Sequence, residues 1–222
     1  MNPSVIMLLL VPIAYITGSL PFGLLVGLSK GVDPRKAGSG NIGATNVGRL
    51  LGGKYFALVF ILDLLKGMLP MLTAAAVLHA KITGAALTTS QYALWLFVGF
   101  AAIAGHLFSC FLKFKGGKGV ATSCGVMLGL FPYFTLAGLL GAGVWIIVFQ
   151  IWRYVSLASM AGAIAFPILY VVLALLLGWP VFGEQWPLLA FAVLVAAMIV
   201  LKHRTNIIRL RAGTENRFAR KA

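Results

Sequence analysis

The sequence predicts an all-α polytopic membrane protein, and three observations favour this fold class. Of its 222 residues, 61% are hydrophobic and only 10% are charged. The mean hydropathy of +1.00 is higher than a soluble domain of this length could hide in its core. Several apolar runs of about 20 residues or more alternate with short polar loops, which is the pattern of membrane-spanning helices.

The net charge of +14 does not indicate a nucleic-acid-binding protein. The basic residues are spread over several short loops between apolar runs instead of lining one soluble face. They fit the excess of Lys and Arg on the cytoplasmic side of membrane proteins. Cys110 and Cys124 lie in or beside apolar runs without a metal-ligand spacing, so we interpret both as small apolar packing residues and expect no metal site.

The first expected span runs from Val5 to Leu28. No Lys or Arg precedes it and it is too long for a signal-peptide core, so we expect it to stay in the membrane with its amino end outside. Residues 18–23 interrupt the run with two glycines and Pro21, which removes a backbone hydrogen bond. We therefore expect a kink or a break there, near the cytoplasmic end.

The loop from Lys30 to Lys54 contains a hydrophilic stretch, residues 38–49, whose groups suit an anion. It combines glycines that allow close approach of the backbone, side-chain donors and one two-pronged cation: Gly38, Gly40, Gly43 and Gly48, then Ser39, Asn41, Thr45 and Asn46, then Arg49. Carboxylates are absent from residues 38–49, which favours phosphate or carboxylate as the ligand over a metal ion. The alternative is an ordinary connecting loop rich in Gly, Asn and Ser.

The second span is expected from Tyr55 to Ala80, and it contains Asp63 and Lys66 three residues apart on one helix face. An acid and a base at this spacing inside a membrane are expected to pair and to fix helix packing. The third span, Tyr92 to Leu112, contains His106, which we interpret as a packing or hydrogen-bonding residue.

A second basic, glycine-rich loop follows from Lys113 to Gly119 and contains Gly116, Gly117 and Lys118. We assign these three residues to phosphate binding or catalysis. The apolar region after it, Val120 to Trp152, is 33 residues long and has Phe131-Pro132-Tyr133 near its middle. Its length and the position of its flanking bases predict two short spans that return the chain to the same side.

Two more spans are expected, Val155 to Leu177 and Trp186 to Leu201, which brings the total to seven. The tail from Lys202 to Ala222 is strongly basic: Lys202, Arg204, Arg209, Arg211, Arg217, Arg220 and Lys221. This predicts a cytoplasmic carboxyl terminus. With the amino end outside, four segments are expected at the cytoplasmic face: the two glycine-rich loops, residues 153–156 and residues 203–206. No internal repeat appears, so residues 1–222 are expected to form a single domain.

The chain holds four acidic residues, which is poor support for paired-carboxylate catalysis or for a divalent metal held by carboxylates. What remains is charge and hydrogen bonding. The side chains expected to clamp phosphate groups at the cytoplasmic interface are Ser39, Asn41, Thr45, Arg49, Lys118, Ser156, His203 and Asn206. An enzyme that joins a small phosphorylated acceptor to a lipid-like donor needs this combination. A small membrane carrier for an organic phosphate anion is the alternative.

Three motifs carry a resemblance to a known family: residues 38–49, residues 105–106 with 115–122, and residues 202–210 with Gly213 and Glu215. The chain closely resembles the acyl-phosphate-dependent glycerol-3-phosphate acyltransferases of bacterial membranes, the PlsY family. The resemblance implies seven spans in the bacterial inner membrane, no cofactor, and an active site that faces the cytoplasm. It also implies six active-site positions: Ser39, Arg49, Lys118, Ser156, His203 and Asn206.

The activity that this resemblance implies is transfer of a fatty acyl group from acyl phosphate to the 1-hydroxyl of glycerol 3-phosphate. The products are lysophosphatidate and phosphate, at the first step of bacterial phospholipid synthesis. The soluble enzyme that makes acyl phosphate is an expected partner. Arg49 and Lys118 are expected to meet the phosphates and the developing charge, and either His203 or a substrate phosphate takes the proton. Glu215 either anchors the tail by pairing with a loop base or is a solvated residue in a cationic tail.

Overall fold

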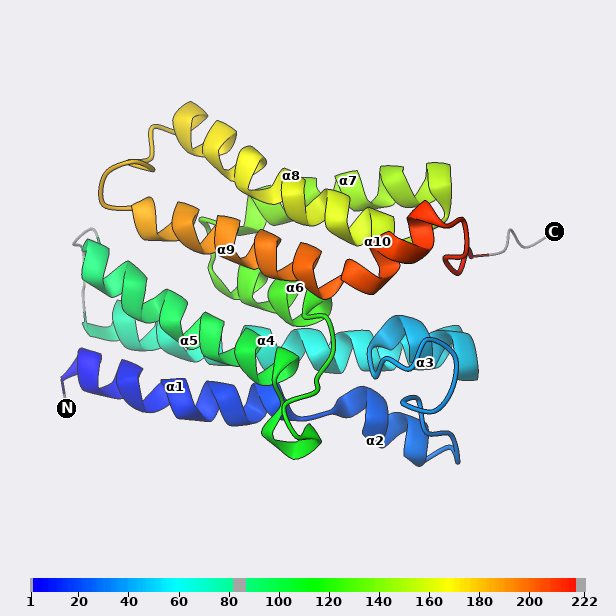
Figure 1. Cartoon of the computed structure of the whole chain (residues 1–222). Helices are drawn as coiled ribbons and strands as arrows, with labels where there is room; N and C mark the ends of the chain where they lie inside the picture. The colour runs from blue at the N-terminus through cyan, green and yellow to red at the C-terminus, as the bar shows by residue number, and fades with distance from the viewer. Residues whose placement is uncertain (1, 82–86, 219–222) are drawn as a thin grey trace. The chain divides into compact units, whose positions relative to one another are not determined.

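The computed structural model describes residues 2–81 and 87–218, and for residues 79–81 the backbone alone. Within these ranges all regular secondary structure is helical, which confirms the all-α class (Figure 1). The chain divides into two compact units, Met1–Leu130 (unit 1) and Phe131–Ala222 (unit 2), and each is described by itself. A single functional domain over residues 1–222 stays a prediction. The tail residues Arg220 and Lys221, which contribute to the prediction of a cytoplasmic carboxyl terminus, lie outside the described part.

Unit 1 begins with the expected broken span. Helix α1 ends at Ser19, α2 begins at Phe22, and Pro21 stands between them. The helices of unit 1 are α1 Pro3–Ser19, α2 Phe22–Leu28, α3 Ala44–Leu51, α4 Gly53–Lys81, α5 Thr89–Leu107, the 3₁₀ turn η1 Cys110–Leu112 and α6 Val120–Gly129. Helix α5 ends five residues before the predicted boundary at Leu112. Cys110 is exposed in η1, so our interpretation of it as a packing residue is wrong.

Helices α4 and α6 pack closely because glycines leave room for the partner's backbone. A Cβ on Gly125 of α6 would overlap the carbonyl oxygen of Leu64, and one on Gly67 of α4 would overlap that of Thr122. Small residues at such positions allow helices to approach in a membrane, where the hydrophobic effect does not drive helices together. This close packing fixes the amino end of α6, which directly follows the second glycine-rich loop.

Unit 2 contains α7 Thr135–Trp152, α8 Val155–Leu176, α9 Trp186–Lys202 and α10 Arg204–Arg211. The separation of α6 from α7 by residues 130–134 confirms that the apolar region from Val120 to Trp152 forms two helices. Phe134 anchors an aromatic core, with its ring centroid 5.0 Å from Phe166 and 5.2 Å from Tyr170. The axis bends by 55° between α9 and α10, so the chain changes direction at His203.

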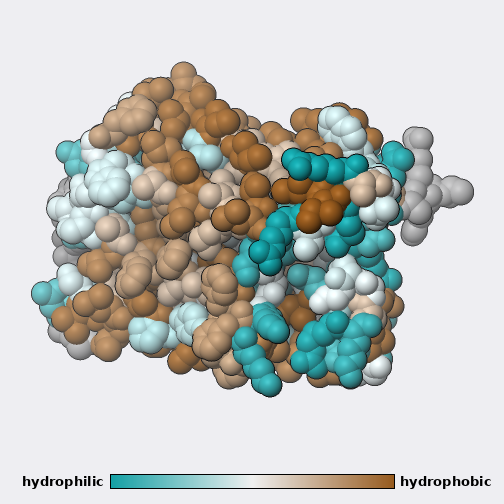
Figure 2. Space-filling view, viewed as in Figure 1, coloured by the Kyte–Doolittle hydropathy of each residue, from teal (hydrophilic) through white to brown (hydrophobic). Residues whose placement is uncertain are grey.

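The described helices include five that are long and apolar enough to cross a membrane, or six when α9 and α10 count as one bent span. Helix α6 has 10 residues and rises about 15 Å, half of the roughly 30 Å hydrocarbon thickness. Large apolar side chains are exposed along these helices, for example Ile13 on α1 (53%) and Ile147 on α7 (60%). Figure 2 shows this apolar surface, and such exposure fits lipid as the surrounding solvent. The seven predicted spans are not established by helix length alone.

Candidate active site

The glycine-rich loop of unit 1 is organised by the buried side chain of Asn46, on the first turn of α3. Its Nδ2 group donates to the carbonyl oxygens of Pro34 (3.0 Å), Ala37 (3.1 Å) and Asn41 (2.8 Å), and its Oδ1 accepts the N–H of Ser39 (2.9 Å). The two hydrogens of the amide are shared among three carbonyls, so one side chain contacts backbone groups at four points of the loop that would otherwise cost free energy on burial. We expected Asn46 to donate to an anion, but its side chain holds the loop instead.

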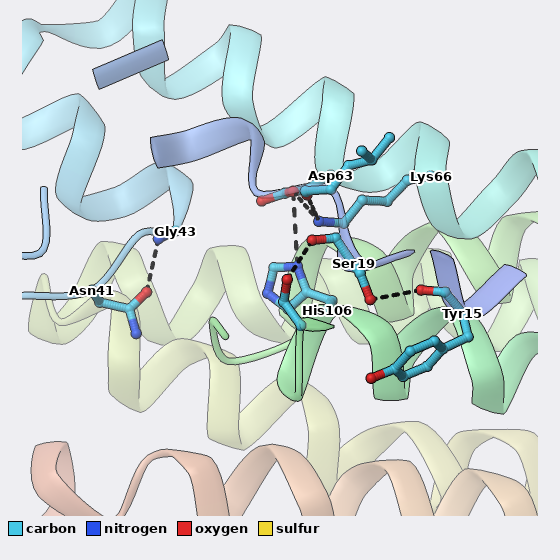
Figure 3. A network of polar contacts seen from close by, with 9 residues as sticks. Tyr15, Ser19, Asn41, Gly43, Asp63, Lys66 and His106 are labelled. Atoms are coloured by element: carbon cyan, nitrogen blue, oxygen red, sulfur yellow. Dashed lines mark hydrogen bonds and ion pairs between the residues drawn. The ribbon is translucent and has the colours of Figure 1, made fainter. Parts of the chain in front are cut away.

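Several backbone N–H groups of the same loop are also engaged within it. Asn41 Oδ1 accepts the N–H of Gly43 at 2.8 Å (Figure 3), and the N–H of Gly40 donates to Ala37 at 3.1 Å. The N–H of Ser39 is likewise engaged, with Asn46 Oδ1. Three backbone N–H groups that the sequence suggested as ligand donors are therefore bonded within the loop. The N–H groups of Gly40 and Gly43 therefore serve the folding of the loop, and anion binding by Gly38 stays a prediction.

Helix α3 offers the donors that suit a ligand best. Its N-cap residue is Gly43, which has no side chain to accept the first-turn N–H groups of Ala44 and Thr45. Thr45 and Arg49 lie four residues apart and therefore on one side of the helix. Asn46 lies on the side that holds the loop. The short helix thus separates the residue that builds the loop from the two that can meet an anion.

The acidic residue beside this loop, Asp33, is neutralised by Arg35. Arg35 Nη2 lies 2.8 Å from Asp33 Oδ2, and its Nε donates to Oδ1 at 3.0 Å. The hydrogen bond from Arg35 lowers the pKa of the Asp33 carboxyl to about 2. Since Asp33 is the only acid between Lys30 and Lys54, the loop region keeps a net positive charge.

The second glycine-rich loop closes the carboxyl end of α5. The N–H of Gly116 donates to Leu107 O and that of Gly117 to His106 O, both at 3.1 Å. These amides satisfy carbonyls that a helix end leaves without partners, so phosphate binding by Gly116 and Gly117 through the backbone is not supported. Lys118 follows directly, one residue before Gly119, the N-cap of α6. A cation at the positive end of a helix dipole creates a strongly anion-attracting position.

In unit 2, one carboxylate gathers three side chains from two helices. Glu215 is buried, and it accepts hydrogen bonds from Ser156 Oγ (2.8 Å), Asn206 Nδ2 (2.6 Å) and Arg209 Nε (2.7 Å). Burial raises the pKa of Glu215, but the hydrogen bonds from Arg209, Asn206 and Ser156 outweigh burial and leave the pKa below its usual value. The interpretation of Glu215 as a solvated residue is wrong: it anchors the tail, but the base that it pairs with is Arg209 on α10 and not a loop base.

His203 stands at the bend between α9 and α10 and is buried. Its Nδ1 lies 2.7 Å from the carbonyl oxygen of Ile199. A carbonyl oxygen can only accept, so in the neutral ring Nδ1 carries the hydrogen and Nε2 carries the lone pair. This tautomer suits His203 Nε2 to accept a proton or a hydrogen bond.

Comparison with known proteins decides the family. Residues 8–213 match the family model described as glycerol-3-phosphate acyltransferase. The chain belongs to this family. The glycerol-3-phosphate acyltransferase of Aquifex aeolicus is 45% identical over 212 residues, 95% of this chain and 98% of the relative. That of Geotalea daltonii is 44% identical over 207 residues, covering 93% and 95%.

Solved structures agree with the sequence comparison. The chain is similar to the glycerol 3-phosphate form of PlsY, an integral membrane glycerol 3-phosphate acyltransferase, with a TM-score of 0.79, 41% identity and 96% of each chain covered. The lysophosphatidic acid form matches with a TM-score of 0.77 and 40% identity. The protein is therefore a PlsY-family acyltransferase of glycerol 3-phosphate, and a multi-pass membrane protein.

Within this acyltransferase, the six predicted catalytic residues fall into two sets. Unit 1 carries Ser39, Arg49 and Lys118, at the glycine-rich loop, on α3 and before α6. Unit 2 carries Ser156, His203 and Asn206, and Glu215 brings Ser156 and Asn206 together. Catalytic roles for all six stay predictions. The sequence did not reveal that Asn46 organises the loop, nor that Glu215 also binds Ser156, which lies 59 residues away along the chain.

Proposed function

We propose that this enzyme transfers a fatty acyl group from acyl phosphate to the 1-hydroxyl of glycerol 3-phosphate, giving lysophosphatidate and inorganic phosphate. The observation that carries the proposal is the similarity, over 96% of both chains, to a solved acyltransferase described in its glycerol 3-phosphate form. The second solved form names lysophosphatidic acid, which is the product of this transfer. The same acceptor and product are therefore proposed for this chain.

The choice of acyl phosphate as donor follows from the charges of the candidate site. Acceptor and donor would each carry a phosphate, and unit 1 places Arg49 on α3 and Lys118 beside the amino end of α6. Asp33, the one acid between Lys30 and Lys54, is paired with Arg35. A site with cations and hydrogen-bond donors suits two phosphate groups and the charge that develops on an acyl carbonyl oxygen.

In the proposed reaction the 1-hydroxyl oxygen attacks the acyl carbonyl carbon and forms a new carbon–oxygen bond. The bond from that carbon to the phosphate oxygen breaks, and phosphate leaves with the electron pair. We assign the hydroxyl proton to a phosphate oxygen of the substrate, since phosphate is a good leaving group and a strong protein base is unnecessary. His203 Nε2 is the one alternative acceptor among the six residues, and its tautomer allows that role. Ser39, Asn41, Thr45, Ser156 and Asn206 orient the two ligands.

The proposal includes a topology of seven spans, with the amino end outside and the site on the cytoplasmic face of the bacterial inner membrane. Its support is the charge pattern: the loops before α3 and α6 and the chain after α9 are rich in Lys and Arg. Helix α6 is the short member of the seven. Placement at this face would let a soluble enzyme deliver acyl phosphate, and that enzyme is the proposed partner.

Mass spectrometry of the reaction products tests the proposal. Purified protein in detergent receives glycerol 3-phosphate with either palmitoyl phosphate or palmitoyl-coenzyme A. The proposal predicts lysophosphatidate from acyl phosphate, and product from the thioester alone would contradict it. Lys118→Ala is expected to lower the rate at least about a hundredfold, the effect of losing one donor to a developing oxyanion. Lys113→Ala, a change of an exposed lysine in the same loop, is the matched control and is expected to keep its activity.

A further inference from the structure

Unit 1 contains a buried polar cluster to which the proposed function assigns no role (Figure 3). Asp63, Lys66 and His106 are between 3% and 6% exposed. Lys66 Nζ lies 2.7 Å from Asp63 Oδ1, as the sequence predicted, and His106 Nδ1 lies 3.8 Å from the same oxygen. The cluster therefore joins α4, which carries Asp63 and Lys66, to the last turn of α5, which carries His106.

Lys66 also fixes the break in the first span. Its Nζ donates to the carbonyl oxygen of Leu20 at 2.8 Å, and Leu20 lies in the break between α1 and α2. A carbonyl freed by a helix break needs a partner inside a membrane, where water is absent. Ser109 Oγ donates to the neighbouring carbonyl of Ser19 at 2.6 Å. The break is thus held from α4 and from the residues that follow α5.

His106 connects the cluster to the loop that carries Lys118. The N–H of Gly117 donates to the carbonyl oxygen of His106, and the imidazole ring lies against Gly117. A Cβ on Gly117 would overlap Nε2 of His106, so the ring occupies the space that any other residue at 117 would need. The orientation of the ring therefore limits where the backbone of residue 117 can lie, and Lys118 is the next residue.

We propose that His106 is a positioning residue for catalysis: its ring, oriented by Asp63 and Lys66, sets the place of Lys118. This inference rests on the proposed function, in which Lys118 meets the charge of the transition state. Burying the charges of Asp63 and Lys66 costs free energy of solvation, and apolar side chains of the same volume could join the helices without this cost. The cluster gives a directed contact that an apolar cluster lacks, because Asp63 attracts one particular edge of the imidazole.

A comparison of two ring substitutions on α5 tests the inference. His106→Phe removes the contact with Asp63, while Trp95→Phe removes another buried contact between α5 and α4, the hydrogen bond from Trp95 Nε1 to Met71 O (3.0 Å). Both variants lose a polar link between the same two helices, and only the first adjoins the Lys118 loop. The thermal unfolding midpoint and the steady-state kcat and KM are measured for both.

We expect His106→Phe to lower kcat by roughly 10- to 100-fold, the range for loss of a supporting contact, with each KM within about threefold of wild type. The control Trp95→Phe is expected to keep kcat within about twofold, whatever its effect on unfolding. His106→Asn should recover at least tenfold of the loss in kcat, because its amide keeps a polar nitrogen near Asp63 Oδ1, where the imidazole Nδ1 now lies. Wild-type kcat in folded His106→Phe, equal loss in Trp95→Phe, or no recovery in His106→Asn would overturn the inference.

A second substitution tests the same contact from the loop, in case His106→Phe does not fold. Gly117→Ala should lower kcat because the added methyl meets the imidazole, and combining it with His106→Asn should relieve the loss because asparagine is shorter. Additive losses in the double variant would contradict the proposed contact. Wild-type protein is assayed in parallel: if it makes no lysophosphatidate, the proposed function itself fails, whereas an active wild type beside an unaffected His106→Phe defeats the positioning role alone.

Discussion

The glycine-rich loop in unit 1 and the tail region in unit 2 are both held by one buried side chain, but the two side chains differ in charge. Asn46 is neutral and bonds to backbone groups, three carbonyls and one N–H. Glu215 is ionised and bonds to three side chains, including Arg209. The amide can both donate and accept, which a loop backbone requires, whereas the carboxylate only accepts and so collects donors. Amide and acid should therefore not be interchangeable at either position.

The largest expected effect on stability comes from Glu215. Glu215→Gln keeps one acceptor but removes the charge that faces Arg209, which is about one third exposed. We expect a loss of about 2–4 kcal/mol in the free energy of unfolding, because the amide NH2 would face Arg209 Nε, which is also a donor. Loss of this anchor should displace the oxygen that Ser156 and Asn206 share and remove most of the activity. Thermal unfolding in detergent together with the activity assay measures both. Glu184→Gln, outside these contacts, is the control, and equal stability of the two variants would contradict the role of Glu215.

The reverse exchange, Asn46→Asp, is expected to cost about 2–3 kcal/mol. The carboxylate can still accept from Ser39, but it cannot donate to the three carbonyl oxygens that Asn46 Nδ2 now contacts. KM for glycerol 3-phosphate is expected to rise as the loop loses its shape. Asn41→Asp keeps its acceptor for the N–H of Gly43 and should cost less free energy of unfolding, so a smaller loss of stability at Asn46 than at Asn41 would argue against the organising role.

The two regions should also respond differently to acid. The pKa of Glu215 is lowered in the folded protein, so its contribution to stability is fully present above the ordinary value of 4.5 and is lost as the pH falls through the lowered pKa. Glu215→Gln is therefore expected to lose stability at pH 7 but to approach wild type at low pH. The deficit of Asn46→Ala should stay constant over the same range. Unfolding midpoints compared between pH 7 and pH 3 measure this, and a deficit of Glu215→Gln that does not shrink would break the comparison.

The smallest expected effect concerns the exposed pair of Asp33 and Arg35 beside the loop. Arg35→Ala should leave the unfolding midpoint nearly unchanged, because exposed ion pairs contribute little to stability. The unpaired carboxylate of Asp33 should raise KM for glycerol 3-phosphate about twofold, as expected for a charge roughly 10 Å away in a water-like medium. The double variant Asp33→Asn/Arg35→Ala should restore KM, and added salt should weaken the effect.

Much of the fold follows from the sequence because the membrane imposes simple rules. The break at Pro21, the division of residues 120–152 and the pairing of Asp63 with Lys66 were all predicted from chain chemistry and spacing. The end of α5 was placed too late, since the run stays apolar to Leu112 while the loop amides of Gly116 and Gly117 terminate the helix at Leu107.

The candidate site was harder to predict than the helices. Composition showed that residues 38–49 and 113–119 are rich in hydrogen-bond donors, but it did not show which of these donors bond within the loops themselves. Asn46 was predicted to bind the ligand because, in the sequence alone, an asparagine in a glycine-rich stretch looks the same whether it binds an anion or holds the loop backbone. Its burial and its four backbone partners in the structure identify the loop-holding role. Glu215 was ambiguous because its partners Ser156 and Asn206 lie on other elements.

We propose that these two regions serve acyl transfer from acyl phosphate to glycerol 3-phosphate. The most direct test is the release of inorganic phosphate from palmitoyl phosphate by the purified protein, with and without glycerol 3-phosphate and with a chelator present in both reactions. We expect phosphate release to depend on glycerol 3-phosphate and to match the lysophosphatidate formed mole for mole. Release at the same rate without glycerol 3-phosphate, or none from a protein shown to be folded, would contradict it.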